Sequence, residues 1–292
     1  MKLSDELHKH IQNDNPDAGV ADMHPLVLEM HNIVAGYRRG HKRLPVLSGV
    51  NISLPPSRVA VMVGRNGSGK STLLRTIAGV QPPLGGTVNI CGHDIRRMNV
   101  RETARHIAMV FSGNTEATGA GALTVAEVVA LGRHPHTGIT GRLHANDRQI
   151  IAEALDAVSM ADKSDVPLAD LSDGLRQKAM IARALAQQTP LIIMDEPTAF
   201  LDVPSRLSLM ALATSLAHQG GRTILLSTHD IAPAMAAGAD SIIIVDNATA
   251  TQYDAYTPAA IQALQGLYRQ DGITYDNDAG DFRVTKQADS EI

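Results

Sequence analysis

Short apolar runs and stretches with helical spacing alternate along most of the chain. In the first third, apolar runs cover Leu26 to Val34, Val46 to Leu54 and Val59 to Val63. Short runs of this kind that end at Pro or Gly predict β-strands. After a glycine-rich turn, the pattern predicts a helix from about Lys70 to Ala78, followed by a turn at the two glycines 85 and 86.

The middle of the chain, between Thr124 and Gln187, has a helical pattern instead. Thr124 and Glu127 have the spacing of a capping box, in which two residues cap the start of a helix reciprocally. Asp147 opens a stretch with apolar residues at helical spacing, and an Ala-rich helix is expected from Leu175 to Leu185. This segment is therefore predicted to be mostly helical.

Strands and helices alternate again from Leu191 onward. The runs LIIMD, TILLS and SIIIVD are separated by helical stretches at Leu207 to Ala217 and Ile231 to Ala237. Uninterrupted apolar runs indicate strands that are covered on both faces, as in a parallel sheet with helical crossovers. The prediction is an α/β core interrupted by a helical insertion. The polar end of the chain contains FRVTK, which could form a short edge strand.

Composition narrows the class of protein. The chain has 292 residues, a length that fits one large or two modest domains. Its formal net charge of -4 does not suggest a basic nucleic-acid surface, and we expect no nucleic-acid partner. Cys91 is the only cysteine, so an intrachain disulfide is excluded and the reducing cytoplasm is favoured. No apolar stretch approaches the roughly 18 residues that a membrane span needs. Residues 1–24 are expected to form a loosely held tail.

The segment GRNGSGKS fits the P-loop pattern, in which a glycine-rich turn wraps backbone N–H groups around phosphate oxygens. It follows the apolar run VAVMV and precedes a predicted helix. A P-loop requires this position between a strand and a helix, whereas an ordinary glycine turn does not. Lys70 should reach the β- and γ-phosphates, and the Ser71 hydroxyl should bind Mg²⁺. The predicted ATP-binding residues here are Gly64, Arg65, Asn66, Gly67, Ser68, Gly69, Lys70, Ser71 and Thr72.

Two adjacent acids end the apolar run LIIMDE. Asp195 is expected to hold Mg²⁺, directly or through water, and Glu196 to act as the general base for the attacking water. Nearby phosphates would raise the pKa of a carboxylate and make it a better base. The alternative is that these acids only mark a strand leaving the core, and the P-loop upstream argues against it.

Two further segments, LSDGLRQ at residues 171–177 and STHD at residues 227–230, complete a pattern that resembles the nucleotide-binding subunits of ABC transporters. The resemblance covers Leu26 to about Tyr268. It implies a P-loop NTPase core, with a RecA-like parallel sheet and an antiparallel β subdomain, plus an inserted helical subdomain. The expected domain is 25–268, with its core at 25–112 and 188–268, the insertion at about 113–187, and a C-terminal extension at 269–292.

The resemblance also implies roles for residues outside the P-loop. Ser172 and Gly174 match the signature that contacts the γ-phosphate bound by a partner subunit, and Asp202 matches the loop beside the partner's site. His229 matches the switch histidine, which completes a catalytic set with Glu196 and Lys70. Tyr37 matches the aromatic residue that stacks on adenine. Singly, Tyr37 could be a surface aromatic residue and His229 a histidine at a strand end, but their order and spacing favour the functional reading.

The chain departs from the family pattern at three positions. Asp173 and Leu175 replace Gly and Gln of the signature, and a carboxylate there would repel a γ-phosphate unless it points away. Ser112 stands where the family has a glutamine that contacts Mg²⁺. Serine is shorter, so water or Glu116 would have to complete that contact.

The resemblance implies that two copies of the chain close head to tail around two ATP molecules. They would drive separate membrane permease subunits from the cytoplasmic face of the membrane, docked on the helical insertion and the loop after Phe111. The segment LTVAEVVALGRHPHTG and the phrase SDGLRQ are similar to importers for iron-siderophores, haem and cobalamin, which implies a solute-binding protein as an indirect partner. His134 and His136 lack further ligands, so a surface turn is expected there rather than a metal site.

Other classes of P-loop protein fit the sequence less well. ABC ATPases of translation carry two cassettes and those of DNA repair carry a long coiled coil, and neither feature is present. A P-loop kinase or GTPase leaves LSDGLRQ and STHD unexplained. A non-catalytic interaction module is disfavoured by the retained site residues, although Asp173, Leu175 and Ser112 leave it open.

Overall fold

The computed structural model describes residues 26–111, 122–138, 141–199, 201–229, 231–267, 273–276 and 281–284. Its centre is a six-stranded sheet in which every strand is parallel to its neighbours except β10. In spatial order the strands are β10 (Thr249–Asp254), β9 (Ser241–Asp246), β3 (Val59–Gly64), β8 (Thr223–Ser227), β7 (Leu191–Asp195) and β6 (Ile107–Phe111).

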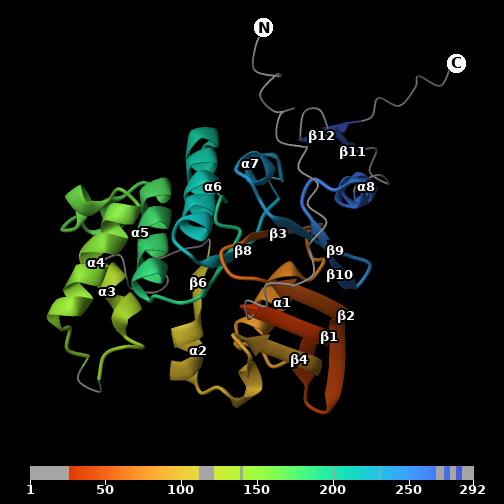
Figure 1. Ribbon diagram of the computed structural model, residues 1–292, viewed down its shortest axis with the longest axis horizontal. Coiled ribbons are helices and arrows are strands. Elements are labelled where there is room, and N and C mark those ends of the chain that lie inside the picture. Colours follow the sequence, from red (N-terminus) through yellow and green to blue (C-terminus); the bar gives the residue numbers. More distant parts are fainter. Residues whose placement is uncertain are drawn as a thin grey trace, which may run out of the picture.

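A four-stranded antiparallel sheet lies below this central sheet in Figure 1, and helix α1 (Lys70–Ile77) lies between the two. The helix buries Leu73, Leu74 and Ile77 in the core that both sheets share. In spatial order the antiparallel strands are β2 (Lys42–Leu54), β1 (Leu28–Arg39), β4 (Gly85–Ile90) and β5 (His93–Asp94).

The strands of the central sheet are covered on both faces, as their apolar runs predict. In β3, Val61 and Val63 pack into the core on one face, while Ala60 and Met62 pack into the core on the other. This alternation follows from the two-residue period of a strand. The predicted α/β fold with a parallel sheet and an antiparallel sheet is therefore confirmed.

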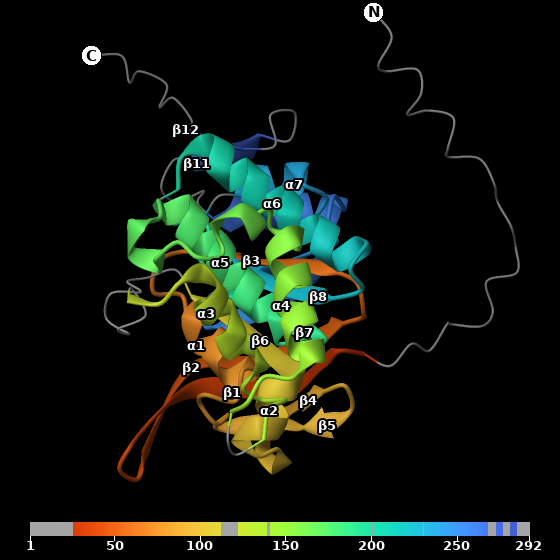
Figure 2. The same cartoon turned by 90° about the vertical axis from the view of Figure 1, so that its left-hand side faces the viewer.

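Helices cover the other face of the central sheet and extend to one side of it (Figures 1 and 2). Thr124 and Glu127 form the predicted capping box at the start of α3. Helices α3, α4 and α5 pack together at the side where β6 lies. The helices after α1 are α2 (Val100–His106), α3 (Val125–Ala130), α4 (Ala145–Ala157), α5 (Asp173–Ala186), α6 (Val203–His218), α7 (Ile231–Ala236) and α8 (Pro258–Leu267).

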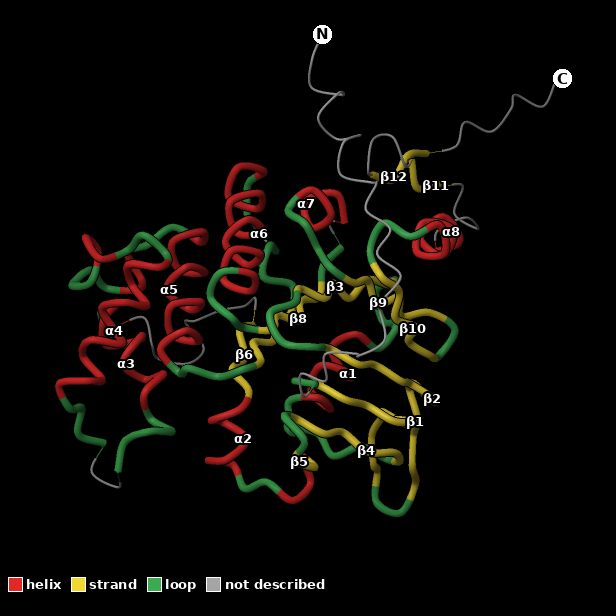
Figure 3. Tube along the Cα trace, viewed as in Figure 1, coloured by secondary structure: helices red, strands yellow, loops and turns green. Residues whose placement is uncertain are grey.

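The fold also contains several short 3₁₀ helices and strands, and Figure 3 colours helices and strands along the chain. Part of the FRVTK segment lies in strand β12 (Asp281–Val284), which pairs with β11 (Ile273–Asp276) in a separate two-stranded sheet. No helix in the described part of the chain is both long and apolar enough to cross a membrane. These short elements are the 3₁₀ helices η1 (Ile95–Arg97), η4 (Leu131–Arg133), η5 (Ala161–Lys163) and η6 (Leu168–Asp170), and the strands β11 (Ile273–Asp276) and β12 (Asp281–Val284).

The prediction of a turn at Gly85 and Gly86 is wrong, because both glycines lie in strand β4. Gly86 has φ of 78°, and a Cβ there would lie 2.5 Å from the carbonyl oxygen of His31 and 2.4 Å from that of Asn32. Gly86 therefore marks a close approach between two backbones rather than a reversal of the chain. Helix α2, which was not expected, begins with a capping box between Asn99 and Glu102.

Candidate functional site

The predicted site residues come together at one edge of the central sheet. Strand β8 lies between β3 and β7, and all three are parallel, so their carboxyl ends meet at the same edge. The P-loop follows β3, Glu196 follows β7 and His229 follows β8. In open parallel sheets, ligands bind outside the carboxyl ends of the strands.

The P-loop turns directly into α1. Gly69 immediately precedes the helix with φ of 111°, a conformation that a residue with a side chain rarely adopts. The Leu73 N–H bonds to the Gly69 oxygen, so the N–H groups at the start of α1 remain directed out of the helix. The buried Ser68 hydroxyl has no hydrogen-bond partner among the described residues. A phosphate would supply the acceptors that these donors lack.

Lys70 is almost completely buried, with 5% of its surface exposed. Its Nζ donates to the carbonyl oxygens of Gly64 (2.8 Å) and Arg65 (3.2 Å). An ammonium has three donors, so one more acceptor can be bound. Burial lowers the pKa of Lys70, and the negative charges of Glu196 and Asp195 oppose that shift. The lysine is therefore a positioned cation beside two acids.

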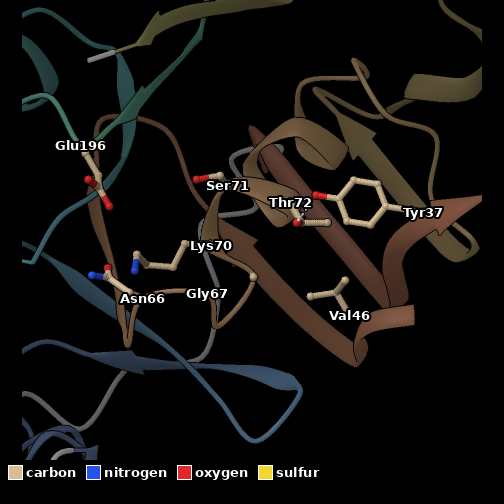
Figure 4. A pocket seen from close by; sticks show the side chains of 9 residues that line it. Tyr37, Val46, Asn66, Gly67, Lys70, Ser71, Thr72 and Glu196 are labelled. Carbon is tan, nitrogen blue, oxygen red and sulfur yellow. Dashed lines mark hydrogen bonds between the residues drawn. The ribbon is translucent and has the colours of Figure 1, made fainter. Parts of the chain in front are cut away.

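A cavity of about 300 Å³ opens between the P-loop and β1. Figure 4 shows Glu196 at one end of this cavity, Lys70 and Ser71 near its middle, and Tyr37 at the other end. The Tyr37 hydroxyl lies 3.0 Å from Thr72 Oγ1, and the residue is 45% exposed. The lining residues are Tyr37, Val46, Asn66, Gly67, Gly69, Lys70, Ser71, Thr72 and Glu196.

The two acids and the histidine form one connected group. Asp195 Oδ1 accepts a hydrogen bond from Ser227 Oγ over 2.6 Å. The Glu196 N–H donates to the same Ser227 oxygen over 2.9 Å. Glu196 Oε1 lies 2.6 Å from His229 Nε2. A carboxylate so placed at a polar cavity can accept a proton from water, and the imidazole can orient it.

The signature residues lie apart from this cavity. Ser172 is the exposed N-cap residue of α5, and Asp202 is the N-cap residue of α6, where it accepts a bond from the Ser205 N–H over 3.1 Å. Hydrogen bonds from Ser205 lower the pKa of Asp202. Gly174 faces the Ser205 side chain. None of these three residues lines the cavity.

Asp173, which stands where the family signature has glycine, forms an ion pair within its own helix. Its Oδ1 lies 2.9 Å from Arg176 NH2, one turn further along α5. This ion pair offsets part of the negative charge on the helix that carries Ser172. Ser112 and Glu116 lie outside the described residues.

Two residues of the site were not assigned a role from the sequence. Val46 lines the cavity, and Ser227 joins the two acids. Ser227 is the first residue of STHD, so its place two residues before the histidine was a signal, but only the pairing of β7 with β8 shows its partners.

His136 lies away from the cavity. Its Nε2 contacts the Gln187 oxygen over 2.8 Å, and burial lowers the pKa of His136.

Comparison with known proteins gives the family. Residues 47–199, more than half of the chain, match the family model described as ABC transporter. The chain belongs to the ABC transporter family. An uncharacterized ABC transporter ATP-binding protein of Methanocaldococcus jannaschii is 37% identical over 76% of this chain and 73% of that protein. The iron(3+)-hydroxamate import ATP-binding protein FhuC of Bacillus subtilis is 38% identical over 64% of this chain and 68% of that protein.

Solved structures of ABC cassettes have the same fold. A dimeric cassette in a post-hydrolysis state with ADP and Pi bound has a TM-score of 0.65 and 27% identity, and covers 79% of this chain and 99% of that one. A nucleotide-free cassette has a TM-score of 0.70 and 21% identity, and covers 87% and 97%. The expected fold and the expected ATPase family are thus confirmed, and the chain is an ABC cassette of the ATP-binding type.

Proposed function

We propose that the chain is the ATP-hydrolysing subunit of an importer, with Glu196 as its general base. The observation that carries the proposal is the position of Glu196, which lines the cavity that contains Lys70 and bonds to His229 over 2.6 Å. In this arrangement Lys70 and the P-loop bind the phosphates, His229 orients the carboxylate, and Glu196 takes the proton of the attacking water. Tyr37 holds the adenine by stacking.

Ser71 and Asp195 offer a set of oxygen atoms that fits Mg²⁺. Ser71 lines the cavity beside Lys70, and Asp195 adjoins Glu196. Mg²⁺ binds one or two protein oxygens and keeps several waters, so a hydroxyl and a carboxylate suffice on the protein side. When bound, the ion would neutralise charge on the phosphates. Ser112 is proposed as a further contact.

We further propose that the site is complete only in a dimer. Ser172, Gly174 and Asp202 do not line the chain's own cavity, which fits a role at the ATP of a second copy. The solved post-hydrolysis cassette is itself a dimer. The proposed domain is 25–268, with residues 25–112 and 188–268 as its core and about 113–187 as the insertion.

The proposal of an importer rests on relatives that are themselves ATP-binding proteins of import or transport systems. Besides the hydroxamate protein, the ferric enterobactin transport ATP-binding protein FepC of Escherichia coli is 34% identical over 66% of this chain and 70% of that protein. We therefore propose solutes of the iron-siderophore, haem or cobalamin type, taken up through membrane permease subunits with a solute-binding protein. The chain would act at the cytoplasmic face of the membrane, held there by the permease.

Substitution of Glu196 tests the function. Glu196→Gln should bind ATP normally and lose at least about 100-fold in hydrolysis, because general-base catalysis contributes roughly 10² to 10⁴ in rate. The measurements are phosphate release and fluorescent-nucleotide titration. Lys70→Ala serves as the contrasting variant and should lose affinity for the nucleotide itself. Hydrolysis by Glu196→Gln at the wild-type rate would refute the assignment.

A further inference from the structure

Ser227 connects the two adjacent acids of the site. It is the last residue of β8, and its side chain is completely buried. The parallel register pairs Ser227 with Asp195 across β8 and β7, which brings the hydroxyl to Asp195 Oδ1 (2.6 Å) and to the Glu196 nitrogen (2.9 Å). The hydroxyl donates its single proton to the carboxylate and accepts the N–H with its oxygen.

The backbone at Glu196 needs such a support. Its φ of 50° lies in the left-handed region, which is unfavourable for a residue with a side chain. Strained residues of this kind persist only where the surroundings hold them, and they cluster at functional sites. The bond from the Glu196 N–H to Ser227 holds the peptide just before the strained residue. That turn sends the Glu196 side chain to His229 and to the cavity.

We propose that Ser227 is a positioning residue for ATP hydrolysis. Its hydroxyl fixes the turn at Glu196 and holds one oxygen of Asp195, so that both carboxylates face the nucleotide in a defined orientation. The proposal rests on the proposed role of Glu196. Ser227 does not line the cavity, so it acts through the two acids and not by contact with ATP.

The first test separates kcat from nucleotide affinity. In Ser227→Ala, kcat should fall roughly 10- to 100-fold, the usual effect of removing a group that orients a ligand-holding residue. The KM for ATP and the affinity for a fluorescent nucleotide should stay within about twofold, because the residues that line the cavity are unchanged. If Ser227→Ala does not fold, Ser227→Cys, which keeps the shape of the side chain in a slightly larger group with a weaker donor, carries the same expectation.

Thr223→Val is the matched control. Thr223 is the buried hydroxyl at the opposite end of β8, where Oγ1 donates to the Pro55 oxygen over 3.0 Å. Removal of the Thr223 hydroxyl costs one buried hydrogen bond at the same strand but leaves the contacts of Asp195 and Glu196 unchanged. The control should keep the wild-type kcat even where its melting temperature falls as far as that of Ser227→Ala. An equal loss of kcat in both variants would overturn the proposal.

A double-mutant cycle tests whether Ser227 acts through Glu196. Glu196→Gln with Ser227→Ala should hydrolyse ATP at the same residual rate as Glu196→Gln alone, since residues that act as a unit are not additive. Losses that multiply, or an unchanged kcat in Ser227→Ala, would overturn the role of Ser227 and leave that of Glu196 standing. Wild-type turnover by Glu196→Gln would instead refute the proposed function on which the role rests.

Discussion

Tyr37 and Lys70 illustrate how single residues of the site are held. Lys70 is buried against two carbonyl oxygens, and Tyr37 is anchored by its hydroxyl to Thr72 on α1 while nearly half of its surface stays exposed. Thr72 follows Ser71 directly, so the tyrosine is tied to the helix that begins at the P-loop. An aromatic ring held in this way at the cavity presents a face on which a base can stack.

Replacing Tyr37 should weaken nucleotide binding. Tyr37→Ala should raise the dissociation constant for ATP roughly 5- to 100-fold, because stacking of a base on an aromatic ring contributes about 1–3 kcal/mol. Tyr37→Phe keeps the ring and loses only the bond to Thr72, so it should bind nearly as well as the wild type. Titration of both variants with a fluorescent nucleotide gives the comparison. Equal affinity of Tyr37→Ala and wild type would show that adenine does not stack here.

At the scale of elements, a buried ion pair ties α4 and α5 to the segment after α3. Arg133 Nε lies 2.9 Å from Asp147 Oδ1, and Arg133 NH1 also donates to the Ala186 oxygen over 2.7 Å. Asp147 accepts the His144 N–H over 2.9 Å at the start of α4. That backbone bond and the Arg133 guanidinium lower the pKa of Asp147. A buried pair with these extra bonds fixes how the elements pack rather than adding stability by itself.

Asp147→Asn should nevertheless destabilise the fold by about 1.5–3 kcal/mol, because it removes a hydrogen bond to a charged group and leaves the buried Arg133 without its counter-charge. Urea unfolding gives the measurement. Glu153→Gln on the exposed side of the same helix should change stability by less than about 0.5 kcal/mol. Because the pKa of Asp147 is lowered by folding, its contribution is present above about pH 4 and is lost as the pH falls through the folded-state pKa. Asp147→Asn should reduce that loss of stability at acid pH, and an unchanged pH profile would contradict the assignment.

At the scale of the whole molecule, the proposed dimer would draw on two separate places of each chain. The cavity with Lys70 and Glu196 lies at the carboxyl edge of the central sheet, whereas Ser172 stands exposed at the head of α5. The ion pair between Asp173 and Arg176 offsets part of the negative charge that the altered signature places beside Ser172. A second copy related by twofold symmetry would offer its Ser172 to the first copy's ATP.

A negative charge at Ser172 should prevent this association. In the Glu196→Gln background, ATP should produce a dimer in size-exclusion chromatography with light scattering, and the added Ser172→Asp should leave the protein monomeric through repulsion of the γ-phosphate. Gln149→Glu, which adds the same charge on the exposed surface of α4, is the control and should still dimerise. Dimer formation by the Ser172→Asp variant would contradict the shared site.

Much of the fold could be predicted from local pattern. The unbroken apolar runs identify buried parallel strands, and GRNGSGKS identifies the phosphate loop, because a glycine-rich turn between a strand and a helix needs those residue types at that spacing. The glycines 85 and 86 were misread because their signal, a backbone without side chains, is the same for a turn and for a close approach of two strands. Helix α2 is too short to show a helical period.

The sequence by itself determined which chemical groups the chain carries and the order in which strands and helices follow one another. The tertiary structure alone decided that β8 separates β3 from β7, and so that Ser227 joins Asp195 to Glu196. It also decided that Asp173 pairs with Arg176. The physical reason is that hydrogen bonds depend on register and direction within a few tenths of an ångström, and these arise only when distant segments pack.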